Sequence, residues 1–407
     1  MNRPPMLSMD EALAALLAQA VPVTGMESVA TLDAHGRVLA AAVRSTLDVP
    51  PMDNTSMDGY AMRAADIVAP GIRLPVSQRV PAGQVPQPLL AGSLARIFTG
   101  AMMPPGADAV VMQEQCTVDG DAVAVNHVPA SGEWVRRAGE DIRAGAEILA
   151  AGALLTPQAC GLAASVGLAA VPVLQKLKVA VFFTGDELAM PGEPLKPGAI
   201  YNSNRFVLRG LIEGLGCRMS DFGIVRDSLD ETRRVLRAAA AEHDLIITTG
   251  GVSVGEEDHV RPAVEAEGEI RLWQIAMKPG KPLAYGRVRR ESGDSADFLG
   301  LPGNPVSGFV TFLLFARPFI LKRQGRTDLA PPALALRADF AWDKPDRRRE
   351  FLRARMNASG GLDLFPNQSS GVLTSTVWAD GLIDNPPSQA IARGDTVRFL
   401  PFSGLLH

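Results

Sequence analysis

Cysteine and histidine are scarce in this chain of 407 residues, and their scarcity argues against two classes of protein. The three cysteines, Cys116, Cys160 and Cys217, are far apart and odd in number, so they predict neither a disulfide framework nor a zinc site. The five histidines are equally scattered, and we interpret His243 and His259 as surface or helix-end residues. We therefore expect a protein of the reduced cytoplasm.

Long apolar runs and an excess of one charge are also absent. The longest apolar stretch, residues 310–321, is shorter than eighteen residues and contains Arg317, so we expect no membrane-spanning segment. Basic residues number 40 and acidic residues 44, and the net charge of −4 provides no general attraction to nucleic acid. Asp10 and Glu11 stand where a secretory signal would have basic residues, so residues 12–20 are expected to form part of an amphipathic helix.

The length predicts two to four domains, and the distribution of patterns favours four. Helical periodicity at residues 8–20 and 156–167 flanks a long region of short alternating stretches separated by proline and glycine clusters. We expect a split, mostly helical domain (residues 1–45 and 146–176) that carries a β-rich inserted domain (residues 46–145). An α/β domain (residues 177–327) and a C-terminal β domain (residues 328–407), predicted to be a small barrel, complete the chain.

Strands and helices alternate through the third of these domains. The continuous apolar run at residues 179–183 is typical of a buried parallel strand, and residues 245–249 are expected to form another buried strand. Helices are expected at residues 203–215, after Ser228 with Glu231 as its capping-box partner, and at residues 306–322. This alternation predicts a doubly wound, mostly parallel sheet with helices on both faces and ligands beyond the carboxyl ends of the strands.

Glycines and acidic residues follow two of the predicted strands. Asp186 and Glu187 come after the first strand, and residues 250–258 combine three glycines with an acidic trio ending at Asp258. Glycines let backbone N–H groups converge on an anion, and carboxylates next to phosphates suit Mg²⁺. For the glycines alone, an ordinary turn before an acidic helix start is the favoured interpretation.

The lysine usage changes that balance. Only seven of the 40 basic residues are lysine, yet Lys278 and Lys281 lie three positions apart among prolines and a glycine. A compact ammonium held this way suits a phosphate or another tetrahedral oxyanion, whereas the alternative is a basic surface loop. Asn304 and Ser307 occur at another expected helix start. Together these strand-end loops predict one pocket for an anionic ligand.

The β-rich region contains polar clusters of its own. Residues 53–60 are rich in small polar side chains, and residues 96–100 and 112–114 are expected to form a hairpin with a polar tip. Composition alone favours turns here, with a functional role as the minority interpretation.

Seven segments occur together in the order and spacing of a known family: residues 53–63, 96–114, 137–145, 184–188, 248–258, 278–282 and 300–307. On these motifs the chain resembles the molybdopterin molybdenumtransferases, the bacterial molybdenum insertases to which the E domain of gephyrin is also similar. The resemblance implies an elongated homodimer whose active-site cleft lies between the α/β domain of one chain and the β-rich domain of the other. It also implies the reaction, in which adenylylated molybdopterin and molybdate give molybdenum cofactor and AMP with Mg²⁺.

The resemblance assigns roles to individual residues. The positions that match the family's functional polar residues are Asp58, Thr99, Asp141, Glu187, Asp227 and Asp258. The residues expected to bind substrate are Gly250, Gly251, Ser253, Gly255, Lys278, Lys281, Pro302, Asn304, Pro305 and Ser307. Glu187 and Asp258 are the expected Mg²⁺ ligands, and Asp58 and Thr99 are the expected contribution of the partner subunit.

Two alternatives remain. An adenylyltransferase on the same α/β core would make the adenylylated pterin, but such enzymes are mostly short single domains whose loop differs from that after Gly250. A non-catalytic scaffold of the gephyrin kind lacks support, because the acidic residues are intact and no long linker is present. Contact with the upstream adenylyltransferase is a further expectation, whereas neither nucleic acid nor a membrane is an expected partner.

Overall fold

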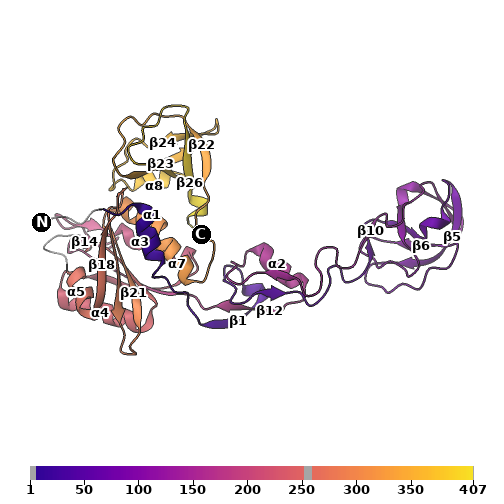
Figure 1. Cartoon of the computed structure of the whole chain (residues 1–407), viewed down its shortest axis with the longest axis horizontal. Coiled ribbons are helices and arrows are strands. Elements are labelled where there is room, and N and C mark those ends of the chain that lie inside the picture. The colour runs from indigo at the N-terminus through magenta and orange to yellow at the C-terminus, as the bar shows by residue number, and fades with distance from the viewer. Residues whose placement is uncertain (1–5, 252–258, 407) are drawn as a thin grey trace. The chain divides into compact units, whose positions relative to one another are not determined.

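The computed structural model describes residues 6–251 and 259–406, which divide into two units (Figure 1). The first unit consists of the described residues within Met1–Glu27, Gly36–Ala40 and Val173–His407. The second unit consists of Ser28–His35 and Ala41–Pro172. The four domain boundaries expected from the sequence stay a prediction.

A six-stranded mixed sheet forms the centre of the first unit. Its strands are, in spatial order, β16 (Arg218–Val225), β13 (Lys178–Thr184), β17 (Leu245–Thr249), β21 (Ser295–Leu301), β20 (Pro282–Arg289) and β18 (Gly268–Gln274). The first four strands are parallel, and β20 and β18 add an antiparallel edge. The carboxyl ends of β13, β17 and β21 therefore meet at the same edge of the sheet.

Helices cover both faces of this sheet, because the apolar side chains of each strand alternate between two cores (Figure 1). In β13, Val181 faces the core shared with α1 (Met9–Leu17), α3 (Ser203–Gly214), α6 (Pro305–Thr311) and α7 (Arg317–Arg323). Phe182 faces the opposite core, shared with α4 (Leu229–Glu242) and α5 (Val260–Glu267). This arrangement confirms the expected α/β architecture.

The expected helix at residues 306–322 is interrupted in its hydrogen bonding. A π-helical segment, Phe312–Ala316, connects α6 to α7. The whole stretch Pro305–Arg323 is the one helix among the described residues with the length and composition to cross a membrane, and 89% of its apolar window is buried inside the protein. It serves as the central core helix of the sheet's first face.

A closed five-stranded barrel forms the C-terminal part of the first unit, as expected. Its strands are β22 (Leu334–Ala338), β23 (Arg349–Met356), β24 (Gly361–Leu364), β25 (Gly381–Asn385) and β26 (Thr396–Pro401), with the short helix α8 (Thr374–Trp378). The barrel closes because β23 pairs with both β24 and β25. A short strand from the α/β region, β19 (Met277–Lys278), pairs in parallel with β23. The barrel and the α/β region are thus joined by backbone hydrogen bonding.

The second unit is mostly β structure. Its main sheet has the order β7 (Ala109–Met112), β4 (Gly59–Met62), β6 (Leu94–Ile97), β5 (Ile72–Val80), β9 (Ala122–Val125) and β8 (Cys116–Asp119). Short pairs join β3 (Asn54–Thr55) to β10 (Val135–Arg136) and β2 (Val43–Arg44) to β11 (Glu147–Leu149). The helix α2 (Pro157–Ser165) begins after its cap residue Thr156. The unit boundary runs through β1 (Met26–Ala30) and β12 (Ala170–Leu174), which pair with each other.

The structure corrects three expectations. β6 and β7 do not form a hairpin, because β4, whose four residues are all buried, lies between them as the central strand. The split domain is not mostly helical: α1 packs into the α/β core of the first unit, and α2 is accompanied by strands. Ser228 precedes α4 as predicted, but its side chain makes no capping hydrogen bond. The capping box predicted at Ser8 and Glu11 is present before α1.

Candidate functional site

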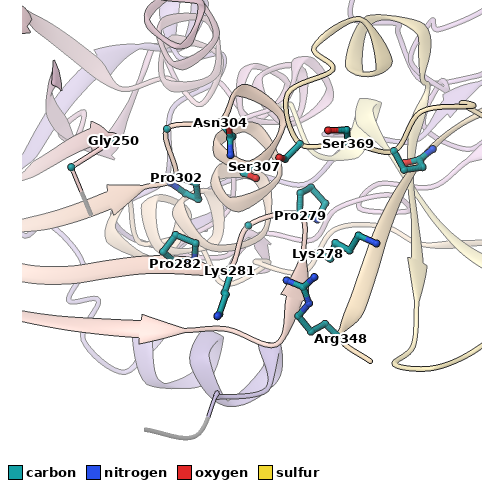
Figure 2. Close-up of a pocket in the computed structure, with 15 residues that line it drawn as sticks. Gly250, Lys278, Pro279, Lys281, Pro282, Pro302, Asn304, Ser307, Arg348 and Ser369 are labelled. Atoms are coloured by element: carbon teal, nitrogen blue, oxygen red, sulfur yellow. The ribbon is translucent and has the colours of Figure 1, made fainter. Parts of the chain in front are cut away.

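A cavity of about 530 Å³ lies at the carboxyl edge of the α/β sheet and is bordered by the barrel (Figure 2). Its lining consists of Gly250, Gly251, Lys278, Pro279, Gly280, Lys281, Pro282, Pro302, Gly303, Asn304, Ser307, Arg348, Gln368, Ser369 and Ser370. Figure 2 shows Lys278 and Arg348 beside each other, with Gly250 on the opposite side of the cavity. Three of the four predicted strand-end loops therefore meet at this cavity.

Strand register brings two of these loops together. β17 and β21 are parallel neighbours with Thr249 opposite Leu301, so the residues that follow them emerge side by side. The Gly250 N–H donates to the Leu301 carbonyl at 3.1 Å. Gly250 has a φ of +87°, and a Cβ on it would lie 3.1 Å from the Thr184 carbonyl oxygen. The glycine predicted to allow close approach to a ligand also allows close packing of the loops themselves.

The lysine loop is positioned by a second glycine. Gly280 has a φ of +108°, and a Cβ on it would lie only 2.4 Å from the Thr311 hydroxyl oxygen of α6. The loop between Lys278 and Lys281 therefore lies directly against the core helix, which any larger residue would prevent. This packing fixes the backbone from which both lysines extend.

Two of the three cations that line the cavity are paired with carboxylates. The Lys278 ammonium lies 3.2 Å from a Glu350 oxygen and 3.5 Å from an Asp346 oxygen. Arg348 donates to both oxygens of Asp346, at 3.0 and 2.9 Å, and these bonds hold the pKa of that carboxyl well below its usual range. Among the described residues, Lys281 has no hydrogen-bonded or ionic side-chain partner. Its charge is available to an anionic ligand.

The barrel contributes four lining residues that the sequence reasoning missed: Arg348, Gln368, Ser369 and Ser370. The Gln368 side chain exchanges two hydrogen bonds with the Arg353 backbone, at 2.9 and 3.1 Å. The buried Arg353 guanidinium also donates to the Ser369 carbonyl at 3.3 Å. The one available signal was the arginine run at residues 347–349, but nothing local indicated that it faces the lysine loop.

A second cavity of about 390 Å³ shares Gly250, Gly303 and Asn304 with the first. Its lining adds Thr184, Glu187, Leu188, Ile200, Tyr201, Asn202, Ser203, Asn204, Thr249 and Pro305. The Asn204 amide, on α3, donates to the Thr249 hydroxyl at 3.2 Å and to the Gly303 carbonyl at 2.8 Å. The fourth predicted loop, after β13, thus lines this neighbouring cavity, and amide and carboxylate groups replace the cations of the first.

Acidic side chains gather beside the second cavity. The Asp186 N–H donates to an Asp227 oxygen at 3.2 Å, and the Asp227 N–H donates back to Asp186 at 3.4 Å. Burial raises the pKa of the Asp227 carboxyl, and the negative charges of Asp186 and Glu187 raise it further. The crowding of negative charge makes this a place where a cation would be stabilising.

The remaining predicted residues lie elsewhere. Ser253, Gly255 and Asp258 fall outside the described residues. Asp58, Thr99 and Asp141 are exposed in the second unit. One oxygen of Asp58 accepts hydrogen bonds from both the Thr99 N–H and hydroxyl, each at 2.7 Å, and these bonds lower the pKa of the carboxyl. The pair therefore presents an oriented, ionised carboxylate.

Comparison with known proteins covers almost the whole chain. Three family models match, described as "MoeA N-terminal region (domain I and II)" over residues 7–167, "Probable molybdopterin binding domain" over residues 180–322 and "MoeA C-terminal region (domain IV)" over residues 335–402. All residues that line the two cavities thus belong to the matched regions.

Relatives match along most of their length. The molybdopterin molybdenumtransferase of Haemophilus influenzae is 38% identical over 409 residues, which is 98% of this chain and 100% of the relative. Molybdopterin molybdenumtransferase 2 of Mycobacterium tuberculosis is 35% identical over 87% of this chain and 89% of its own length. The molybdopterin biosynthesis moeA protein of Pyrococcus horikoshii has a crystal structure that matches with a TM-score of 0.85 and 28% identity, over 98% of this chain and 100% of that one. The chain therefore belongs to the molybdopterin molybdenumtransferase family and is a transferase of molybdenum cofactor biosynthesis.

Proposed function

We propose that this chain inserts molybdate into adenylylated molybdopterin and releases AMP. The observation that carries the proposal is the pair of cavities that share Gly250, Gly303 and Asn304. One cavity is lined by three cations and the other by a carboxylate and several amides. A ligand that spans both would place an anionic group against the cations and hydrogen-bonding groups, such as those of a pterin, against the amides.

Lys281 is proposed as the main anion-binding residue. Its ammonium has no acidic partner among the described residues. By contrast, Lys278 and Arg348 are both paired with carboxylates of the barrel. Molybdate is a tetrahedral dianion, and the compact charge of an ammonium suits it. Ser307 and Ser369 line the same cavity, and their hydroxyl groups can donate hydrogen bonds to the oxyanion. Binding in this cavity would hold molybdate next to the pterin ligand in the neighbouring one.

The carboxylates beside the second cavity fit Mg²⁺. This cation binds oxygen ligands, often one or two carboxylates together with substrate phosphates. Glu187 lines the cavity. Asp186 and Asp227 lie nearby, and the negative charges of Asp186 and Glu187 act on Asp227. Among residues 6–251 and 259–406, no group of three or more histidine, cysteine, aspartate or glutamate side chains could hold a metal ion. Substrate phosphates would therefore complete the ligand set. When bound, Mg²⁺ would neutralise charge on the phosphoanhydride that is split.

We further propose that the active protein is a homodimer in which Asp58 and Thr99 of one chain act at the site of the other. The exposed and hydrogen-bonded Asp58 carboxylate supports this proposal, because an ionised acid held in one orientation at the surface is accessible to a ligand or to a second chain. A contact with the adenylyltransferase that supplies the substrate is part of the same proposal.

The direct test is AMP release. Purified protein is incubated with adenylylated molybdopterin, molybdate and Mg²⁺, and AMP is measured by chromatography. We expect release that requires both molybdate and Mg²⁺. Absence of molybdate-dependent AMP from substrate shown to be intact would refute the insertion reaction.

A further inference from the structure

Glu350 is a buried carboxylate of the barrel that reaches a residue of the anion-binding cavity. It lies on β23, directly opposite Lys278 in the parallel pairing with β19. Its side chain is fully buried, whereas that of Lys278 is 38% exposed. Glu350 does not line the cavity itself, so its effect there must pass through another residue.

The two oxygens of Glu350 have separate partners. One accepts hydrogen bonds from the Trp342 indole N–H at 2.8 Å and from the Asp346 backbone N–H at 3.1 Å. The other accepts from the Lys278 ammonium at 3.2 Å. The barrel therefore fixes one half of the carboxylate and leaves the other half directed at the lysine.

The difference in burial decides which residue positions the other. A buried carboxylate that loses its hydrogen bonds has no water to replace them, so Glu350 stays in place. Lys278 is partly exposed and has a flexible stem, so its ammonium has other places to go. The neighbouring Asp346 lies 3.5 Å from the same ammonium but already accepts two bonds from the Arg348 guanidinium. Of the two carboxylates, Glu350 is therefore the nearer to the Lys278 ammonium, and unlike Asp346 it accepts no hydrogen bond from the Arg348 guanidinium.

We propose that Glu350 is a positioning residue that holds the Lys278 ammonium at the edge of the anion-binding cavity. Glu350 acts on the cavity through its ion pair with Lys278, and Lys281 remains the residue that binds the oxyanion most strongly. The consequence for catalysis rests on the proposed function, whereas the placement of Lys278 does not. A lysine held in this way would orient the anionic substrate more than it would increase its affinity, since its charge is balanced by the carboxylates.

The test compares Glu350→Gln with Asp384→Asn. Glutamine keeps an acceptor for the Trp342 N–H but removes the charge that attracts Lys278. Asp384 is a buried carboxylate on the adjoining strand β25 that binds Arg349 at 2.6 and 2.7 Å and does not line the anion-binding cavity, so its loss controls for a weakened barrel. Three quantities are measured on each folded protein: the Kd for molybdate, the kcat and KM of AMP release, and the rates at which Lys278 and Lys281 are reductively methylated, followed by mass spectrometry.

In Glu350→Gln we expect kcat to fall by about tenfold or more with the molybdate Kd nearly unchanged, because orientation is lost while charge is kept. Methylation of Lys278 should become faster relative to that of Lys281, since the Lys278 ammonium is no longer held in an ion pair with Glu350. Asp384→Asn should change the melting temperature without either effect. Equal Lys278 methylation in Glu350→Gln and the unchanged protein would overturn the proposal, as would an equal loss of kcat in both variants.

Two outcomes need separate readouts. If Glu350→Gln does not fold, methylation of the unchanged protein decides: the proposal requires Lys278 to react more slowly than Lys281, and equal rates contradict it. If the unchanged protein releases no AMP, the proposed function fails, but the methylation rates still decide whether Glu350 positions Lys278.

Discussion

The backbones of Gly250 and Gly303 approach so closely that a Cβ on Gly303 would lie 3.4 Å from the Gly250 Cα. These residues follow the neighbouring strands β17 and β21, and both line the two cavities. The wall shared by the cavities is therefore made of two loops in contact. Side chains at this point would separate the loops and change both cavities together.

Gly250→Ala is expected to lower stability by about 1–2 kcal/mol, because alanine at a φ of +87° is strained. It should also weaken molybdate binding, since the new Cβ would press on the Thr184 carbonyl at 3.1 Å. Gly293→Ala is the matched control: its φ is +91°, but no atom lies within 4 Å of the added Cβ. Urea denaturation and molybdate titration separate strain from crowding. Equal molybdate affinity in the two variants would contradict a role for this contact.

Lys281→Arg is expected to weaken molybdate binding by roughly tenfold, about 1.4 kcal/mol, although the charge is kept. The guanidinium is broad and planar, and the loop that carries it is packed against Thr311 and cannot easily move. Lys196→Arg, in an exposed loop, is the control for the same substitution elsewhere. Titration calorimetry with molybdate gives both affinities. An unchanged Kd for Lys281→Arg would remove this lysine from the proposed anion site.

Subunit exchange tests the proposed sharing of the active site. Asp58→Ala and Glu187→Ala are each expected to be inactive as homodimers. In a mixed dimer one site receives both alanines and the other receives Asp58 and Glu187 intact. With random exchange and two-fold symmetry, about a quarter of all sites should recover, and AMP release should return to about that fraction.

The same experiment distinguishes the opposite arrangement. If Asp58 and Glu187 served a site within one chain, every site would lack one of them and mixing would restore nothing. Exchange itself is verified with differently tagged subunits. Absence of recovery in a verified mixture would reject the shared site.

Acid should weaken the second unit partly through Asp53. The Ala138 N–H at 2.8 Å, with the Arg137 guanidinium at 2.6 Å, lowers the pKa of this carboxyl below its ordinary value. A carboxyl whose pKa is lower in the folded state stabilises the fold above its unfolded pKa, and this contribution is lost as pH falls through the folded pKa. Asp53→Asn should therefore be less stable near neutral pH and should lose less stability on acidification.

Urea denaturation at several pH values from 7 to 3, followed by fluorescence, measures this difference. The range is chosen because the ordinary pKa of an aspartate is about 4. Asp121→Asn, an exposed change of charge in the turn between β8 and β9, is the control for removing one negative charge from the unit. Parallel pH dependences in Asp53→Asn and the unchanged protein would show that these hydrogen bonds contribute nothing.

Strands that are buried on both faces were the easiest part of the fold to predict. Residues 245–249 form β17 with the predicted bounds, and all five are buried, as expected for β-branched and aliphatic residues in a central parallel strand. The loops of Gly250 and Asn304 could also be predicted, since they follow parallel strands whose ends lie at one edge. The Lys278 loop lies at the same edge because it precedes β20, which is antiparallel to β21. Of the described residues predicted to bind substrate, all but Pro305 line one cavity.

Contacts between distant segments could not be predicted in the same way. Lys278 and Glu350 are 72 positions apart, and their pairing depends on β19 joining β23, for which a two-residue strand carries no periodic signal. Likewise, β4 enters between β6 and β7 because of sheet topology, which local alternation does not encode. The contribution of Arg348 and Ser369 to the cavity depends on the same long-range pairing. Local pattern therefore locates loops but not the partners they meet.

The Val306 N–H, in the first turn of α6, donates to the Ser370 carbonyl of the barrel at 3.0 Å. An N–H at a helix start has no partner within its own helix, so this amide is protected from solvent only while the barrel loop is seated. The hydrogen-exchange rate of this amide therefore reports how often the barrel loop separates from the start of α6. A bound ligand that contacts both the loop and the helix start should slow this exchange.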